Sequence, residues 1–140
     1  AFRIARVPVL KSVLKFITPR FMAESSVKNV YVDDSKVTPE LVDRYWELTL
    51  REGNRAAFVA RLNQNTTMDD HWKNMHTIAI PVLIEWGKYD ELIPVEIAQR
   101  FHRDLPNDTL IVYSNAGHVP MEEIPEQTAQ DARVFLKKKE

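Results

Sequence analysis

The sequence contains no cysteine, which excludes a disulfide framework, a thiolate nucleophile and a zinc site built on cysteine ligands. Long hydrophobic runs are also missing, because the apolar stretches extend over a few residues and a bilayer span needs roughly 20. Neither sign of charge dominates, since 19 basic residues face 20 acidic ones and the formal net charge is −1. A chain with no overall positive field is not expected to bind nucleic acid.

Glycine is scarce, and Gly53, Gly87 and Gly117 are the three in 140 residues. The rest of the composition is ordinary for a globular protein, with 44% hydrophobic and 28% charged residues, and the length suits a single domain. We therefore expect a soluble chain, with the cytoplasm as its compartment. Because the sequence begins at Ala1 and not at methionine, we also expect a processed or shortened chain.

Residues 3–20 carry basic side chains and no acidic ones. Their apolar residues recur at helical spacing and predict a basic amphipathic helix (Leu10, Val13, Leu14 and Ile17). Such a helix either packs its apolar stripe against a domain or lies on an anionic membrane surface. The first role is the more frequent one, so membrane association is not expected. The following residues, 21–37, show no sustained period and predict a connector with a short strand at 30–32.

Two further helices are predicted between residues 38 and 62. Thr38 supplies an N-cap hydroxyl, Pro39 suits the first helical position, and Gly53 is a typical C-terminal stop. Asn54 then caps a shorter helix, which gives a helical hairpin. The aromatic side chains of this hairpin either pack the two helices together or line a pocket (Tyr45, Trp46 and Phe58).

A polar cluster follows, formed by Asp69, Asp70, His71 and His76. Helical zinc-binding histidines are typically four residues apart, whereas His71 and His76 are separated by five. The spacing favours a helix cap with solvated imidazoles, so no metal site is expected. Nearer the C-terminus, Glu122 and Glu123 are expected to favour the start of the final helix or to pair with cations.

From residue 78 the pattern alternates between strands and helices. Residues 81–86 predict a buried strand closed by Gly87, and Pro94 opens a helix. Residues 109–114 are β-branched or apolar and predict a second strand, and Pro125 begins a last helix that ends in basic residues. A βαβα order predicts two parallel strands joined by a right-handed crossover.

Parallel strands place the turns that follow them at the same edge of the sheet. One such turn holds Asp90 and the other holds His118. Adjacent strands lie about 4.8 Å apart, so the two side chains can meet although they are 28 residues apart in sequence. An aspartate held against one imidazole nitrogen fixes the tautomer and leaves the other nitrogen free as a base. From the residues alone, a functional Asp90–His118 pair and two unrelated residues in separate turns are equally good interpretations.

These residues resemble the α/β-hydrolases. Residues 86–90, Trp-Gly-Lys-Tyr-Asp, look like the acid turn that follows the penultimate strand of that family. Gly117-His118, followed by two glutamates and by Pro125, looks like its histidine turn. The resemblance implies an α/β class, specifically a partial α/β-hydrolase fold in which a helical cap or lid, residues 1–75, precedes a terminal βαβα unit, residues 76–140. It also implies that Asp90 is the triad acid and His118 the general base.

One part of the family pattern is missing from the sequence. The nucleophile of these enzymes lies on an elbow of the Gly-x-Ser-x-Gly kind, and none of the serines has that flanking. Members of a triad act as a unit, so the isolated chain is expected to be nearly inactive. Whether the nucleophile is a serine or an aspartate stays open. A non-catalytic interaction module that keeps the hydrolase architecture is the alternative function.

The resemblance further implies hydrolysis of a small ester, epoxide or halide substrate without a metal or an organic cofactor. Leu92 and Val119 adjoin the two turns and are the expected apolar pocket residues, by position alone. Two strands are marginally stable by themselves and expose an edge. We therefore expect a partner at this edge, either a missing N-terminal half or another copy of the chain.

Overall fold

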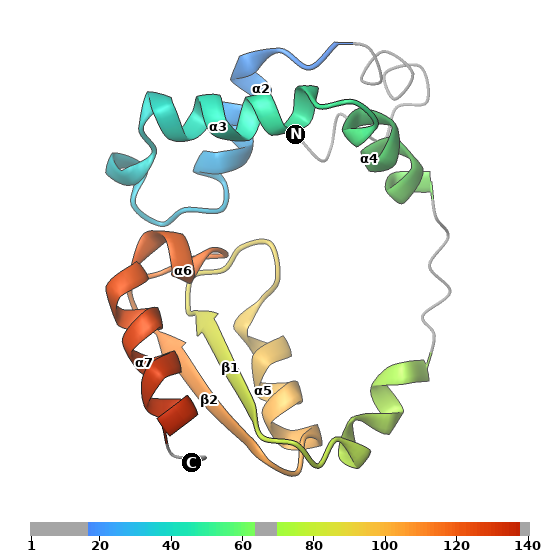
Figure 1. Cartoon of the computed structure of the whole chain (residues 1–140), viewed down its shortest axis with the longest axis vertical. Helices are drawn as coiled ribbons and strands as arrows, with labels where there is room; N and C mark the ends of the chain where they lie inside the picture. Colours follow the sequence, from blue (N-terminus) through green and yellow to red (C-terminus); the bar gives the residue numbers. More distant parts are fainter. Residues whose placement is uncertain (1–16, 64–69, 138–140) are drawn as a thin grey trace. The chain divides into compact units, whose positions relative to one another are not determined.

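The computed structural model describes residues 17–63 and 70–137 (Figure 1). They form two compact units: residues 17–29 with 37–63, and residues 30–36 with 70–137. The short segment 30–36 thus belongs with the strands and not with the helices that flank it in the sequence. The expected boundary between residues 75 and 76 stays a prediction, and most of the expected basic helix lies outside the described residues.

The first unit consists of three helices, α2 (Arg20–Lys28), α3 (Pro39–Leu50) and α4 (Asn54–Asn63). Helix α2 corrects the prediction of a connector over residues 21–37. Its buried face is only Ala23 and Val27, four residues apart, which gave no sustained periodicity. Exposed pairs one turn apart support it, such as Lys28 Nζ and Glu24 Oε1 at 2.9 Å.

The boundaries of α3 follow the predicted signals. The Thr38 hydroxyl accepts the amide of Leu41, and Pro39 is the first helical residue. Gly53 has φ of +82°, a left-handed conformation that favours glycine after a helix. The indole of Trp46 donates to the carbonyl of Thr18 at 2.7 Å, so this aromatic residue holds backbone of its own unit.

The second unit contains the predicted βαβα order. Its elements are η2 (Asp34–Lys36), η3 (Asp70–Thr77), β1 (Val82–Gly87), α5 (Val95–Asp104), β2 (Asp108–Tyr113), α6 (Pro120–Glu123) and α7 (Pro125–Lys137). The two strands are parallel, with register from Val82 opposite Asp108 to Gly87 opposite Tyr113. The parallel pair is therefore confirmed, whereas the single turn α6 was not predicted. No strand forms at residues 30–32, because the described sheet contains β1 and β2 alone.

Separate apolar clusters cover the sheet of this unit. Ile84, Ala98 and Leu105 join the strands to α5. Tyr113 and Ile124 belong to a second cluster, toward α6 and α7. Successive side chains along each strand point to opposite faces of the sheet. The two short strands can therefore contribute residues to both clusters. The sheet is thereby fixed from both faces.

The turns after β1 and β2 approach each other at backbone distance. The amide of Lys88 donates to the Tyr113 carbonyl at 2.8 Å, and the amide of Tyr89 donates to the Ala116 carbonyl at 3.2 Å. A Cβ added to Gly87 would lie 1.9 Å from the carbonyl oxygen of Gly117, a distance that no side chain tolerates. Glycine at position 87 therefore permits the contact between the two turns.

The buried hydroxyl of Tyr113 lies between two carboxylates. It is 2.5 Å from Glu85 Oε1 of β1 and 3.0 Å from Asp131 Oδ2 of α7. Burial, together with these hydrogen bonds, raises the pKa of the Tyr113 hydroxyl well above its usual value. The hydroxyl thus ties the last helix to the sheet in its protonated form.

No helix among the described residues is both long enough and apolar enough to cross a bilayer.

We expect the substitution Gly87→Ala to destabilise the second unit by about 3 kcal/mol or more, since the new methyl group collides with backbone that cannot retreat. Urea unfolding followed by circular dichroism measures the effect. Gly53→Ala is the matched control, because nothing lies within 4 Å of its added Cβ and the cost is backbone strain of about 1 kcal/mol. Equal losses for the two variants would contradict the close approach.

Alkaline pH should weaken the fold through Tyr113. The native state holds the hydroxyl proton more tightly than the unfolded chain, so stability is complete below about pH 10 and declines above it, by up to about 1.4 kcal/mol per pH unit. Urea unfolding at a series of alkaline pH values measures the slope. Tyr113→Phe should flatten it, and an unchanged slope in that variant would disprove the assignment.

Candidate functional site

Asp90 lies in the turn between β1 and α5, and its side chain is only 4% exposed. One carboxylate oxygen, Oδ1, accepts the backbone amides of Leu92 at 2.9 Å and of Ile93 at 2.8 Å. Aspartate is favoured in such turns because its short side chain can bond the amides that follow it. The two bonds fix the plane of the carboxylate and leave Oδ2 for another partner.

That partner is His118, in the turn that follows β2. Its Nδ1 lies 2.9 Å from Asp90 Oδ2, so the predicted meeting of the two side chains at one edge of the sheet is found in the structure. The imidazole is 29% exposed and thus remains accessible from solvent. The backbone amide of His118 donates to the carbonyl of Val30 at 2.9 Å.

The contact with a carboxylate determines the tautomer of His118. An ionised carboxylate can only accept hydrogen bonds, so Nδ1 must be the protonated nitrogen. Nε2 then carries the lone pair, and no hydrogen bond joins it to the described residues 17–63 and 70–137. Imidazole exchanges protons near neutral pH, and a neighbouring carboxylate stabilises its charged form. The pair can therefore act as an oriented general base.

A second histidine–aspartate pair occurs in the same unit and lacks these features. His102 Nδ1 lies 2.8 Å from Asp108 Oδ2, but the imidazole is 58% exposed. Asp108 is the first residue of β2, so this pair lies where the strands begin, whereas Asp90 lies where they end. Distance alone does not distinguish the two pairs, whereas burial of the imidazole and position on the sheet do.

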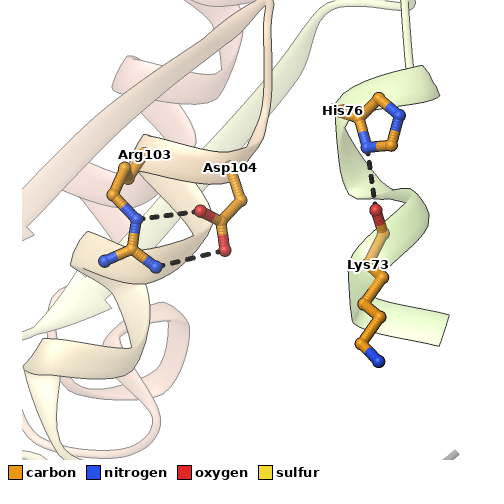
Figure 2. Close-up of a pocket in the computed structure, with 4 residues that line it drawn as sticks. All are labelled: Lys73, His76, Arg103 and Asp104. Carbon is orange, nitrogen blue, oxygen red and sulfur yellow. Dashed lines mark hydrogen bonds and ion pairs between the residues drawn. The ribbon is translucent and has the colours of Figure 1, made fainter. Parts of the chain in front are cut away.

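The pocket in Figure 2 also lies away from Asp90 and His118. It has a volume of about 350 Å³ and is lined by Lys73, His76, Arg103 and Asp104. Arg103 forms an ion pair with Asp104 at 2.9 Å, and His76 Nδ1 lies 2.8 Å from the carbonyl of Lys73. Arg103 and Asp104 end α5, near the start of β2, so the pocket is at the other edge of the sheet. Its polar groups are engaged with each other, and it offers no substrate site for the Asp90–His118 pair.

The expected pocket residues lie beside the paired side chains along the chain. Leu92 is 43% exposed, and its amide is one of the two bonded to Asp90. Val119 is half-buried and immediately precedes α6. Their role in lining a substrate pocket stays a prediction.

Glu123 was not recognised from the sequence as part of this site. No cation of the described residues pairs with its side chain, which accepts the backbone amides of Gly117 at 2.6 Å and of Val32 at 2.8 Å. Lys36 reaches the backbone carbonyl of Glu123 and not the carboxylate. The available signal was the motif itself, in which Glu122 and Glu123 follow Gly117-His118, but no contact of Glu123 with this turn was predicted from it.

Among the side chains that the structure describes, in residues 17–61 and 73–137, no three histidine, aspartate or glutamate groups are placed to hold a metal ion. Asp69, from the polar cluster discussed above, lies outside the described residues.

The chain is similar to known proteins over most of its length. Residues 11–125 match the family model described as the alpha/beta hydrolase fold. The uncharacterized hydrolase YugF of Bacillus subtilis is 29% identical over 78% of this chain and 40% of its own length. A 2-hydroxy-6-oxononadienedioate/2-hydroxy-6-oxononatrienedioate hydrolase of Burkholderia vietnamiensis is 30% identical over 79% of this chain and 39% of its own.

A solved structure extends the likeness to the fold. The thermophilic esterase from Thermogutta terrifontis superposes with a TM-score of 0.71 at 24% identity, over 97% of this chain and 48% of that one. The chain thus spans about 40% of the length of the curated relatives it matches.

The substitution Asp90→Asn should reverse the tautomer of His118. The amide oxygen of asparagine would keep the bonds from Leu92 and Ile93, which turns its NH₂ group toward Nδ1. Nδ1 must then accept, and the proton moves to Nε2. Long-range proton–nitrogen NMR above the imidazole titration distinguishes the two forms. Asp108→Asn is the matched control, and a His118 tautomer unchanged by Asp90→Asn would refute the assignment.

Proposed function

The chain belongs to the alpha/beta hydrolase fold family, and on that premise we propose that Asp90 and His118 are the acid and the general base of a hydrolase active site. The observation that carries this proposal is the contact of 2.9 Å between Asp90 Oδ2 and His118 Nδ1, at the edge where the parallel strands end. The carboxylate is almost fully buried and already oriented by two amides. Such preorganisation costs no rearrangement during the reaction.

The expected chemistry starts at Nε2 of His118. This nitrogen takes the proton of the attacking group, which is a serine hydroxyl or, if the nucleophile is an aspartate, the water that cleaves the covalent intermediate. Asp90 stabilises the imidazolium that results. With a serine nucleophile, the same nitrogen then returns the proton to the leaving group, so the pair serves as base and acid in turn. With an aspartate nucleophile, the leaving group has departed before the water attacks, and the proton passes from the imidazolium to solvent.

The nucleophile is proposed to come from a partner segment that adds the early part of the fold. No serine of this sequence has the flanking glycines of an elbow, and the chain spans about 40% of its curated relatives. In the described sheet, β1 pairs with β2 on one side only, which leaves an edge for another strand. The isolated chain should be nearly inactive, and a second copy is the alternative partner at that edge.

The proposed substrate is a small ester, with an epoxide or halide as the alternative if the nucleophile is an aspartate. A relative named as a 2-hydroxy-6-oxononadienedioate/2-hydroxy-6-oxononatrienedioate hydrolase is among the similar proteins, and this name supports hydrolysis of a small molecule. Residues 1–75 are the proposed helical cap or lid region of the fold. Leu92 and Val119, beside the acid and the base, would supply apolar contacts to the substrate.

Complementation tests the proposal. The chain is mixed or fused with the upstream half of a related hydrolase that bears the nucleophile elbow, and hydrolysis of an aryl ester is followed. We expect activity that depends on both pieces and falls by at least about 10³-fold in His118→Ala, because the triad members act together.

The second histidine–aspartate pair supplies the control. His102→Ala removes an imidazole that is bonded to aspartate at the opposite edge of the sheet, so it should leave the activity of the complex unchanged. A properly assembled complex that stays inactive would instead favour a non-catalytic interaction module. Equal losses in the His102 and His118 variants would also contradict the proposal.

A further inference from the structure

Glu123 is a buried carboxylate whose partners are all backbone groups. The residue is 3% exposed, and its oxygens accept the amides of Gly117 and Val32. A buried charge is costly unless hydrogen bonds satisfy it, and charge-assisted bonds to amides are strong ones. A carboxylate in this environment holds two pieces of main chain together more firmly than a neutral side chain could.

The first of these pieces carries His118. Gly117 directly precedes the histidine, and its surroundings leave no room for a side chain: an added Cβ would lie 2.7 Å from the Val30 carbonyl oxygen and 3.1 Å from Glu123 Oε1. The amide of Gly117 is bound by Glu123, and the next amide, that of His118, is bound by Val30. Hydrogen bonds therefore fix two successive backbone amides, those of Gly117 and His118. The position of this backbone determines where the His118 side chain begins.

The second piece is segment 30–36, which comes from far upstream in the sequence. Val30 accepts the amide of His118, and Val32 donates to Glu123 across 91 residues. Tyr31 is buried and donates to Glu122 at 2.7 Å, while Lys36 bonds the carbonyl of Glu123. The segment forms no strand, so these bonds are what joins it to the histidine turn.

We propose that Glu123 is a positioning residue for His118: its buried carboxylate clamps the histidine turn to segment 30–36 and so keeps the imidazole in reach of Asp90. This inference rests on the proposed function for its catalytic meaning. Productive geometry at such sites is held within about 0.5 Å by supporting groups, and Glu123 supplies that support from behind the histidine. It acts through the main chain and touches no reacting atom.

NMR of the isotope-labelled 140-residue chain tests the clamp through two readouts, the hydrogen exchange of the Gly117 and His118 amides and the Nδ1 proton signal of His118. In Glu123→Ala we expect both amides to exchange at least about tenfold faster relative to the amide of Ile84, and the Nδ1 signal to weaken. Glu123→Gln should be intermediate, because one amide oxygen replaces two carboxylate oxygens.

Two controls separate positioning from general stability. Glu122→Gln changes the adjacent carboxylate, which Tyr31 binds, and should leave both amides within about twofold of the wild type. Leu105→Ala weakens the core on the α5 side and should speed exchange everywhere without affecting the Nδ1 signal.

Each result decides the matter. An unchanged His118 signal and unchanged amide exchange in a folded Glu123→Ala chain would overturn the inference. So would a pattern like that of Leu105→Ala, or loss of folding in both Glu123 variants, since Glu123 would then serve the fold as a whole. If Asp90→Asn leaves the tautomer of His118 unchanged while Glu123→Ala frees the amides, the proposed function fails and the clamp stands.

Discussion

The contact between the turn after β1 and the turn after β2 is the constraint on which the site depends. Gly87 and the Ala116–Gly117 backbone approach so closely that a single added carbon would fill the space between them. Two backbone amides of the turn after β1 donate across this contact to the carbonyls of Tyr113 and Ala116, so the separation of Asp90 and His118 follows from main-chain geometry and not from side-chain flexibility. Few glycines are present in the chain, and two of them are used at this contact.

Two carboxylate side chains, those of Asp90 and Glu123, are buried near that contact. Asp90 is buried but accepts three hydrogen bonds, and Glu123 is buried but accepts two. In a medium of low polarity these bonds are stronger than at the surface, and an unsatisfied group would be costly. His118 is the partly exposed member of the arrangement, and its Nε2 is the nitrogen that the proposed general base would present to a substrate.

The parallel βαβα order and the meeting of Asp90 with His118 could be predicted from the sequence, because strand order alone determines at which edge the two turns lie. Helix α2 could not, since Ala23 and Val27 are too few to produce a helical period. The contacts of residues 30–32 were missed for another reason: their partners lie far away in the sequence, 91 residues in the case of Val32 and Glu123, and no local pattern reports such partners. The sequence motif included Glu123, but its contacts with the amides of Gly117 and Val32 were not predicted, because bonding to backbone amides leaves no signature in residue spacing.

Segment 30–36 has a consequence for how the chain may be divided. It lies between helices α2 and α3 in the sequence, yet its hydrogen bonds belong to the histidine turn. A truncation at the start of β1 would keep the strands, both turns and the final helix. It would remove the Val30 carbonyl, which accepts the His118 amide, and the Val32 amide, which donates to the Glu123 carboxylate. The smallest piece that keeps His118 in its observed position is therefore discontinuous in the sequence. A single cut chosen for a truncation or a domain exchange will separate segment 30–36 from the histidine turn to which it is bonded.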